Sequence, residues 1–346
     1  MAYPDFVLEK FRIFLFLSFY SLAVFQASCG AIKYNVNGIK SPYFVVTEFS
    51  NNRVLIFQSF PVGNQSADIV LGQSTMTTSG TGLSASTLNG PISAVSDGQR
   101  LYVSDFSNNR VLIWNSIPTQ NGQPADLVLG QPNMTTGTIG GGSQGLQTPV
   151  GITIAQNKLF VTDYENSRVL IWNSLPTQNQ QPADVVVGQT TMAGVASAGT
   201  RVRFNHPTGT AFDGQRLYVR DRLNNRILIW NSLPTVSQQA ADLVLGQSNF
   251  SSITANAGTT VNALGFDNPI ALTSVDGKRL MAVDANNNRL LIWNSIPSQS
   301  SQSADAVIGQ VNLTSKVAGT TAQNFSVPTE IYSNGLESGV WRPSGY

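Results

Sequence analysis

Residues 105–114 read DFSNNRVLIW, and close copies of this phrase occur five times along the chain. In each copy, a polar turn leads into an arginine and then into an apolar run that ends in Phe or Trp. The arginines are 57, 58, 58 and 63 residues apart, at Arg53, Arg110, Arg168, Arg226 and Arg289. A Gly-Gln pair keeps a matching period, with its glutamines at Gln73, Gln131, Gln189, Gln247 and Gln310. A repeat of this length predicts a solenoid or a propeller, in which similar units pack side by side.

One repeat, residues 91–147, predicts four short strands. They are expected at 91–96, 100–104, 110–114 and 125–129, with turn-forming residues between them. The apolar runs are rich in β-branched and aromatic residues and lack a 3.6-residue period, which excludes a helical repeat. Such a sheet is apolar on both faces, so each unit needs a neighbour on either side. The aromatic residues that end the third strand are expected in the interfaces between units; they are Phe57, Trp114, Trp172, Trp230 and Trp293.

The phrase Asp-x-x-Asn-Asn-Arg-Val/Ile-x-Ile-Trp resembles the NHL repeat, which is a β-propeller blade of bacterial surface proteins and binding modules. The resemblance covers nearly all of residues 43–333 and recurs five times. It implies an all-β fold, a β-propeller built from four-stranded antiparallel blades. The blades of this chain are longer than the usual NHL unit, and the extra length lies in the crossover after each Gly-Gln pair.

Five copies of the phrase predict five blades, and six is the alternative because NHL propellers are commonly six-bladed. The first unit lacks a first strand of its own, whereas residues 328–332 at the other end resemble one. We therefore expect a C-terminal strand to complete the N-terminal blade and to close the ring, which removes free sheet edges. The predicted propeller covers residues 43–333, and residues 334–346 form a C-terminal tail.

The N-terminal segment is typical of an export signal. Lys10 and Arg12 precede an apolar run at 13–25, which is too short to span a bilayer but fits a signal peptide. We expect a signal peptide at residues 1–28 and a tether at 29–42. The small residues before Cys29, the single cysteine, resemble a bacterial lipoprotein signal, which implies lipidation of Cys29 and anchoring to a membrane of the bacterial cell envelope. An ordinary cleaved signal and an uncleaved anchor are the alternatives.

Composition and residue types exclude several functions. Charged residues form 11% of the chain and the formal net charge is +1, too little to attract nucleic acid or a membrane surface. The single histidine, His206, cannot build a multi-histidine zinc site, and no catalytic triad is recognisable around it. We expect no nucleic-acid partner, no cofactor, no metal and no catalytic residues.

Acidic residues that recur in every repeat are expected to serve the blade itself. The acid before each turn can accept backbone N–H bonds and face the arginine of the same turn. These acids are Glu48, Asp105, Asp163, Asp221 and Asp284. The same reasoning covers the acids of the fourth strand, Asp68, Asp126, Asp184, Asp242 and Asp305. Function is therefore expected where the repeat is broken.

The clearest break lies in the fourth repeat, where arginines flank the repeated acid and also occur in the crossover before it. In an antiparallel meander this crossover and this turn lie on one face, so we expect the arginines in one sector beside His206. Guanidinium groups there suit a carboxylate, a phosphate or an acidic loop of a partner. The alternative is that nearby carboxylates such as Glu165 neutralise them. The arginines are Arg201, Arg203, Arg220 and Arg222.

The predicted function is that of a non-catalytic, monomeric binding or scaffold propeller that presents loops to a protein, peptide or glycan partner. The first alternative is an enzyme that resembles propeller lactonases and hydrolases. That resemblance implies Glu, Asn and Asp ligands for a divalent ion at the entrances of the inner strands, where this chain has one carboxylate, Glu330. The second alternative is a purely structural envelope protein.

Overall fold

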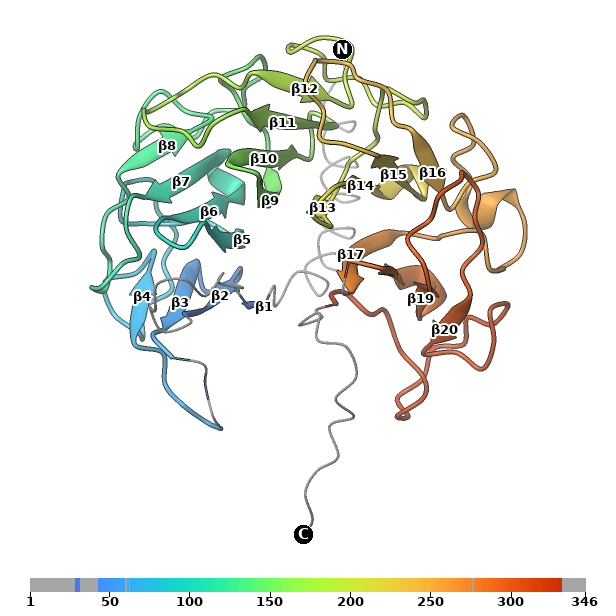
Figure 1. Cartoon of the computed structure of the whole chain (residues 1–346). Helices are drawn as coiled ribbons and strands as arrows, with labels where there is room; N and C mark the ends of the chain where they lie inside the picture. Colours follow the sequence, from blue (N-terminus) through green and yellow to red (C-terminus); the bar gives the residue numbers. More distant parts are fainter. Residues whose placement is uncertain (1–28, 32–42, 60, 62, 276, 332–346) are drawn as a thin grey trace, which may run out of the picture.

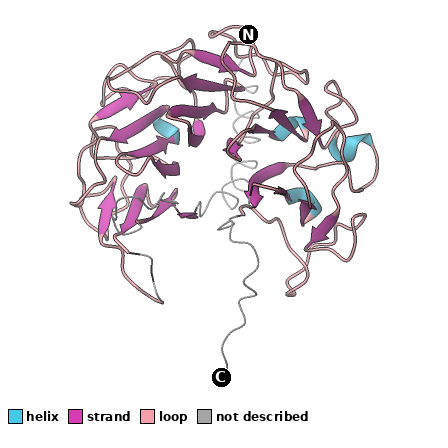
Figure 2. Ribbon diagram, in the orientation of Figure 1, coloured by secondary structure: helices cyan, strands magenta, loops and turns pink. Residues whose placement is uncertain are grey.

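The computed structural model describes residues 29–31, 43–59, 61, 63–275 and 277–331, which form five four-stranded antiparallel sheets (Figure 1). Almost everything else in these residues is loop, apart from four short 3-10 turns (Figure 2). The five-bladed, all-β prediction is confirmed. In each blade the first strand lies nearest the centre of the molecule and the fourth lies at the outside.

The first blade contains β1 (Cys29–Ala31), β2 (Phe44–Glu48), β3 (Arg53–Phe57) and β4 (Ile69–Leu71). The second contains β5 (Pro91–Ser96), β6 (Leu101–Asp105), β7 (Arg110–Trp114) and β8 (Leu127–Leu129). The third contains β9 (Pro149–Ala155), β10 (Lys158–Asp163), β11 (Arg168–Trp172) and β12 (Val185–Val187). The fourth contains β13 (Gly209–Phe212), β14 (Leu217–Asp221), β15 (Arg226–Trp230) and β16 (Leu243–Leu245). The fifth contains β17 (Pro269–Val275), β18 (Arg279–Asp284), β19 (Arg289–Trp293) and β20 (Ala306–Ile308). The 3-10 turns are η1 (Phe106–Asn108), η2 (Arg222–Asn224), η3 (Ala255–Gly258) and η4 (Ala285–Asn287).

Neighbouring blades pack through apolar faces, because successive residues of a strand point to opposite sides of the sheet. In the third blade, Phe160 and Ile171 pack against the fourth blade, whereas Leu170 and Trp172 pack against the second. The indole of Trp172 is 1% exposed, and its Nε1–H donates to the carbonyl of Gln181 at 2.9 Å. Trp114, Trp230 and Trp293 are buried in the same way, so the predicted interface role of the tryptophans is confirmed.

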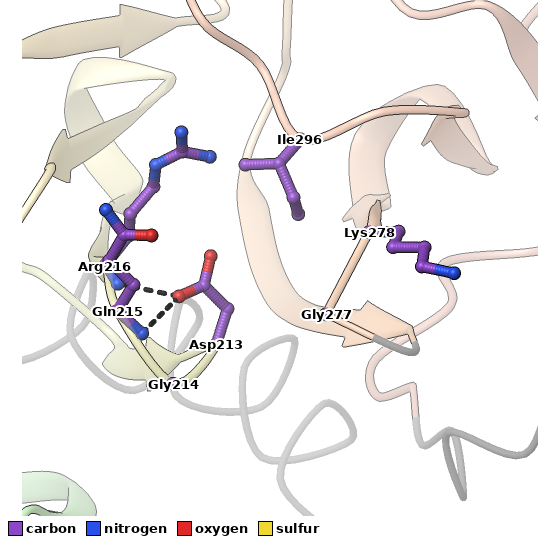
Figure 3. Close-up of a pocket in the computed structure, with 7 residues that line it drawn as sticks. All are labelled: Asp213, Gly214, Gln215, Arg216, Gly277, Lys278 and Ile296. Carbon is purple, nitrogen blue, oxygen red and sulfur yellow. Dashed lines mark hydrogen bonds between the residues drawn. The ribbon is translucent and has the colours of Figure 1, made fainter.

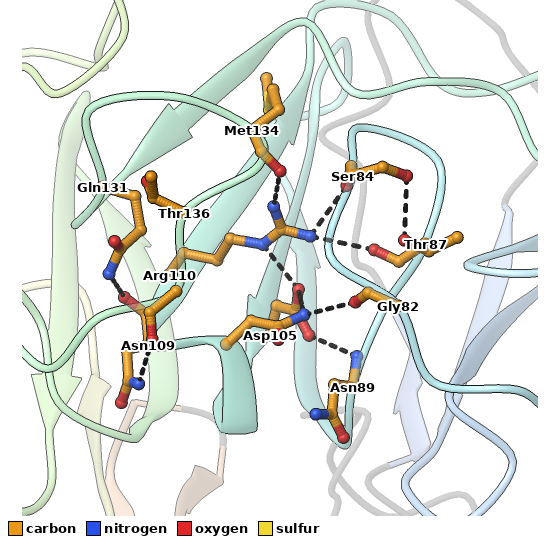
Figure 4. Close-up of polar contacts among 12 residues, drawn as sticks. Gly82, Ser84, Thr87, Asn89, Asp105, Asn109, Arg110, Gln131, Met134 and Thr136 are labelled. Carbon is orange, nitrogen blue, oxygen red and sulfur yellow. Dashed lines mark hydrogen bonds and ion pairs between the residues drawn. The ribbon is translucent and has the colours of Figure 1, made fainter.

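The repeated acid organises the turn that follows it (Figure 4). One carboxylate oxygen of Asp105 accepts the backbone N–H of Asn89 at 2.7 Å. The other oxygen accepts Nδ2–H of Asn108 at 2.8 Å and Nε–H of Arg110 at 2.7 Å. Both Asp105 and Arg110 are 0% exposed. The structural role predicted for this acid is therefore confirmed.

The arginine of the turn also fixes the long crossovers. Nη2 of Arg110 donates to the carbonyls of Ser84 and Thr87 at 2.9 and 3.0 Å, and Nη1 donates to the carbonyl of Met134 at 2.5 Å (Figure 4). Ser84 and Thr87 lie in the crossover that enters this blade, and Met134 lies in the crossover that leaves it. One buried guanidinium thus holds two crossovers on the same blade.

A repeated hydrogen bond joins each blade to the next. Asn109 ends the turn after β6 at a φ of 53°, and its Oδ1 accepts the N–H of Thr148 at 2.9 Å. Thr148 stands just before the inner strand of the third blade. The same bond joins Asn288 to Val327 at 2.8 Å, after the fifth blade. Asparagine adopts left-handed backbone more readily than other residues with side chains, which explains its recurrence at this point of the turn.

Replacing Asn109 with alanine is expected to lower the free energy of unfolding by about 2–3 kcal/mol, because it removes the side-chain hydrogen bond to Thr148 and because alanine tolerates left-handed backbone less well than asparagine. Urea denaturation followed by circular dichroism measures this change. The control is Asn115→Ala, since Asn115 is exposed and uses only its backbone N–H, toward Asp126. Equal losses in the two variants would contradict the role of the Asn109 bond.

The five blades lie side by side around a common axis as an arc (Figure 1). Contacts join the first blade to the second through β2 and β5, and the inner strands β5, β9, β13 and β17 contact one another in turn. In Figure 1 the described strands of the first and fifth blades stand at the two ends of this arc.

The inner edge of the first blade differs from our expectation. Cys29–Ala31 forms β1, with Cys29 opposite Val46 and Ala31 opposite Phe44. Residues 328–331 lie in no strand, and residue 332 lies outside the described residues. Among the described residues, β1 and not residues 328–331 pairs with β2. A segment close in sequence to β2 loses less chain entropy on pairing than one that must return from the far end of the chain.

The structure also changes the predicted boundary at the N-terminus. The sequence predicts a tether over residues 29–42, whereas its first three residues form β1. The predicted signal peptide at 1–28 and the predicted tail at 334–346 lie outside the described residues. Within the part of the chain that the structure describes, no helix has the length and apolar character needed to cross a membrane.

Candidate ligand site at the mouth of the arc

One position at the end of the second strand is partly exposed in four of the five blades and varies between them. It directly follows the repeated acid and is occupied by Phe49, Phe106, Tyr164, Arg222 and Ala285 in turn. The rings of Phe49 and Phe106 meet edge to face with centroids 5.9 Å apart. This face of the arc therefore carries aromatic surface over three blades and a guanidinium on the fourth.

Arg222 is held by two neighbouring blades. Its Nε–H donates to Oδ1 of Asn268 at 2.6 Å, and its Nη1–H donates to the hydroxyl of Tyr164 at 3.4 Å. Nη2 makes no hydrogen bond to any residue that the structure describes. The guanidinium is thus oriented by its neighbours and keeps donors for a ligand.

His206 lies against the same tyrosine. The two rings meet edge to face with centroids 4.8 Å apart. Nε2 of His206 is 3.5 Å from a carboxylate oxygen of Glu165, and Nδ1 is 2.7 Å from Oδ1 of Asn205. Five residues thus gather on this face of the arc, which we call its mouth. They form the mouth cluster, which consists of Tyr164, Glu165, His206, Arg222 and Asn268.

The surroundings of Tyr164 keep its hydroxyl in the protonated form. Burial raises the pKa of the Tyr164 hydroxyl, the charge of Arg222 opposes this change, and the charge of Glu165 adds to it. The hydroxyl therefore stays protonated at neutral pH and can donate to a ligand while it accepts from Arg222. Together these groups offer recognition through hydrogen bonds, an ionic contact and an aromatic surface.

Arg201 and Arg203 make separate contacts in the crossover of the fourth blade. Nε and Nη2 of Arg201 donate to the carbonyl of Ala241 at 3.1 and 2.7 Å, and its guanidinium lies 4.5 Å from the ring centre of Phe250. Nη2 of Arg203 donates to Oγ1 of Thr190 at 3.4 Å. These two arginines brace their own crossover and do not contact the mouth cluster.

Arg220 points between blades instead of out of the mouth. Its Nη2 donates to the carbonyl of Thr208 at 3.3 Å, and its buried Nε has no partner among the described residues. A Cβ on Gly209 would lie 1.7 Å from this guanidinium, so only glycine leaves room for it. Burial lowers the pKa of Arg220, and the carboxylate of Glu330 acts in the opposite direction.

The structure therefore brings together two of the five residues that the sequence singles out, Arg222 and His206. It adds Tyr164 and Asn268, which the sequence analysis did not select. Comparing the residue after each repeated acid would have identified Tyr164, because it occupies the position of Arg222 in the next blade. Glu165 pairs with His206 and not with the arginines.

A hollow on the opposite face lies between the fourth and fifth blades (Figure 3). It has a volume of about 380 Å³ and is lined by Asp213, Gly214, Gln215, Arg216, Gly277, Lys278 and Ile296. One carboxylate oxygen of Asp213 accepts the N–H groups of Gln215 and Arg216 at 2.8 and 2.6 Å. The other oxygen accepts the hydroxyl of Tyr218 at 2.7 Å. Both oxygens of this carboxylate therefore already accept hydrogen bonds from the same hairpin.

Within the described ranges, no three residues among His, Cys, Asp and Glu gather as ligands for a metal ion. No protein-family model matches the chain, and no curated protein matches its sequence.

Several solved structures have a similar fold. The RRP9 WD40 repeats are 9% identical with a TM-score of 0.46, over 79% of this chain and 64% of that one. Nidogen in its complex with laminin is 16% identical with a TM-score of 0.42, over 72% and 71%. The periplasmic gluconolactonase PpgL of Pseudomonas aeruginosa is 15% identical with a TM-score of 0.43, over 80% and 66%. The chain spans just under two thirds of the WD40 structure. The β-propeller fold of this chain is given by its own five four-stranded sheets and not by these similarities.

Proposed function

We propose that this chain is a non-catalytic binding propeller of the NHL type, and that its mouth cluster holds an acidic group of a peptide or glycan partner. The observation that carries the proposal is the guanidinium of Arg222, which two blades orient while Nη2 has no partner in the described structure. A guanidinium matches a carboxylate or phosphate through two parallel hydrogen bonds. The partly exposed rings of Tyr164 and His206 add the amphipathic surface that is typical of binding sites.

We expect Arg222→Ala to weaken retention on arrays of acidic glycans and acidic peptides about 10- to 100-fold, which is the range for a hydrogen bond to a charged group. Arg222→Lys keeps the charge but loses the planar fork of donors. Its affinity for the arrays is therefore expected to lie between that of the original chain and that of Arg222→Ala. Lys158→Ala is the control of equal charge change, because Lys158 is partly exposed at the start of β10 and contacts Asn173. Undiminished retention by Arg222→Ala would remove the proposal.

For the location of the protein, we propose a lipid anchor at Cys29 in the bacterial cell envelope, either periplasmic or surface-exposed. The support is the apolar run at 13–25 followed by small residues and a single cysteine. Mass spectrometry of the mature N-terminus tests this directly. An unmodified N-terminus at another residue would contradict the anchor.

The competing proposals are a propeller lactonase or hydrolase and a purely structural envelope protein. Turnover of lactones or esters by the purified chain, lost in Arg222→Ala, would favour the enzyme. A chain that neither turns over these substrates nor binds any array would favour the structural role.

A further inference from the structure

One position of the second strand varies between the blades and bonds to an inner strand. It directly precedes the repeated acid and is occupied by Thr47, Ser104, Thr162, Arg220 and Val283 in turn. In the first two blades its hydroxyl donates to a carbonyl in the inner strand of the following blade. Thr47 donates to Ile92 at 2.9 Å, and Ser104 donates to Val150 at 3.2 Å. In these blades the position therefore ties one blade to the next.

The third blade lacks this bond. The hydroxyl of Thr162 has no hydrogen-bond partner among the described residues, although Thr162 is 0% exposed. The repeat assigns the carbonyl of Thr208 to it as the acceptor. A Cβ on Gly151 would lie 3.3 Å from the hydroxyl of Thr162 and 3.2 Å from that carbonyl oxygen, so the two groups are close neighbours. The carbonyl instead accepts Nη2 of Arg220 at 3.3 Å.

The inner strand of the fourth blade carries a second exception at the same place. The position of Thr208 is apolar in the other described inner strands, where Ile92, Val150 and Ile270 occupy it. Thr208 is 6% exposed, and its hydroxyl makes no hydrogen bond within the described ranges. A buried hydroxyl without a partner is unfavourable. Two such hydroxyls at one carbonyl indicate a group that the described residues do not supply.

The guanidinium of Arg220 has unused donors. Its Nε is buried without a partner, and its Nη1 makes no hydrogen bond to any residue that the structure describes. The residue as a whole is partly exposed, so a small solute can reach the guanidinium. The charge of Glu330 acts on Arg220, but no ion pair joins the two in the described structure. A cation in such surroundings is stabilised by a counter-charge.

We propose that Arg220 is the centre of an anion-binding site at the inner strand of the fourth blade, and that the site takes a carboxylate or phosphate group. The planar N–H donors of a guanidinium match two oxygens of such a group. The unpartnered hydroxyls of Thr162 and Thr208 are further donors beside it. A guanidinium only donates hydrogen bonds and is positively charged, which excludes a cation as the ligand. The site is separate from the mouth cluster and does not rest on the proposed function.

Thermal melts in different sodium salts test the site. All chains carry Arg222→Ala, so that the mouth cluster does not contribute. At constant ionic strength and pH 7, we expect the melting temperature to rise by at least about 3 °C when phosphate or acetate replaces chloride, because a ligand of the folded state stabilises it. The larger of the two shifts identifies the preferred group. An absent rise with both anions would overturn the proposal.

Arg220→Thr identifies the residue that is responsible, because it restores the residue type of the third blade. We expect it to abolish the rise, whereas Lys158→Ala, an equal change of charge, leaves the rise unchanged. General salt effects are common to all these chains and cancel in the comparison. Equal rises in Arg220→Thr and in the chain that keeps Arg220 would overturn the site.

Gly209→Ala tests the geometry without removing the charge. Its Cβ would lie 1.7 Å from Nη2 of Arg220 and therefore displaces the guanidinium. Alanine is the natural residue at this position of the fifth blade, Ala271. We expect isothermal titration calorimetry to show at least about tenfold weaker phosphate binding, the loss for a hydrogen bond to a charged group. Unchanged binding would show that the anion does not lie on this guanidinium and would overturn the site.

Glu330→Gln separates a solute anion from a carboxylate of the chain itself. If the site is open to solutes, this variant binds phosphate at least about twofold more tightly, because it removes a like charge. If Glu330 is the counter-charge, the variant instead melts at a lower temperature, and this loss disappears in the Arg220→Thr background. The second result would overturn the proposal.

Discussion

Replacing Asp105 with alanine lowers the free energy of unfolding by about 3–5 kcal/mol, because it leaves the guanidinium of Arg110 buried without its counter-charge. Asp105 also accepts the N–H of Asn89 and Nδ2–H of Asn108, so the substitution removes the partners of two further donors. Both members of the ion pair are 0% exposed. Water cannot replace the lost contacts unless the blade opens.

The matched control is Glu48→Ala, which removes the same acid in the first blade. Glu48 and Arg53 are 27% and 17% exposed, so water solvates the remaining arginine and the expected loss is at most about 1 kcal/mol. Urea denaturation followed by circular dichroism gives both values. If the two variants lost equal stability, burial would not be the reason that the turn is stabilised.

The second large effect is expected for Trp172→Ala, with a loss of about 3–5 kcal/mol in the free energy of unfolding. The indole is 1% exposed and packs between the second and third blades. Removal of the indole leaves a cavity that two rigid sheets cannot close. The carbonyl of Gln181 also loses its hydrogen bond from Nε1–H.

Phe57→Ala is the control for the tryptophan variant, because Phe57 holds the same position in the first blade and is only partly buried. We expect it to lose about half as much stability, since less apolar surface is exposed by the change. Thermal melts monitored by circular dichroism avoid the signal change that the loss of a tryptophan causes in fluorescence. A loss for Phe57→Ala equal to that for Trp172→Ala would contradict the link between burial of this side chain and stability.

The strands and their roles could be predicted from the sequence because the same pattern of apolar runs and turn residues occurs five times. The strands expected at 91–96 and 110–114 are β5 and β7, and the other two in that blade are shifted by no more than two residues. The inner strand of the first blade could not be predicted in this way. Its three residues, Cys29–Ala31, carry no repeat signal, and pairing with β2 depends on chain proximity and not on pattern.

The candidate site was only partly predictable. Arg220 and Arg222 lie on either side of Asp221, but Arg220 belongs to a strand and Arg222 begins a 3-10 turn. Residues of a strand alternate between its faces, so Arg220 shares the face of Tyr218 and points between blades. Arg201 lies in a long crossover, where the sequence does not determine the side-chain direction, and its cation–π contact with Phe250 was not foreseeable.

The central claim is that residues shared by all repeats build the blades, whereas the exceptions at the mouth serve a ligand. Arg226 and Arg222 test it, because they are four residues apart in one blade, and the first is shared by all repeats whereas the second is not. Arg226 is 0% exposed and pairs with Asp221 at 2.6 Å, whereas Arg222 is partly exposed at the mouth.

The deciding measurement is the free energy of unfolding of Arg226→Ala and of Arg222→Ala by urea denaturation. The account predicts a loss of about 3–5 kcal/mol for Arg226→Ala and of less than about 1 kcal/mol for Arg222→Ala. Equal losses, or a larger loss for Arg222→Ala, would contradict it.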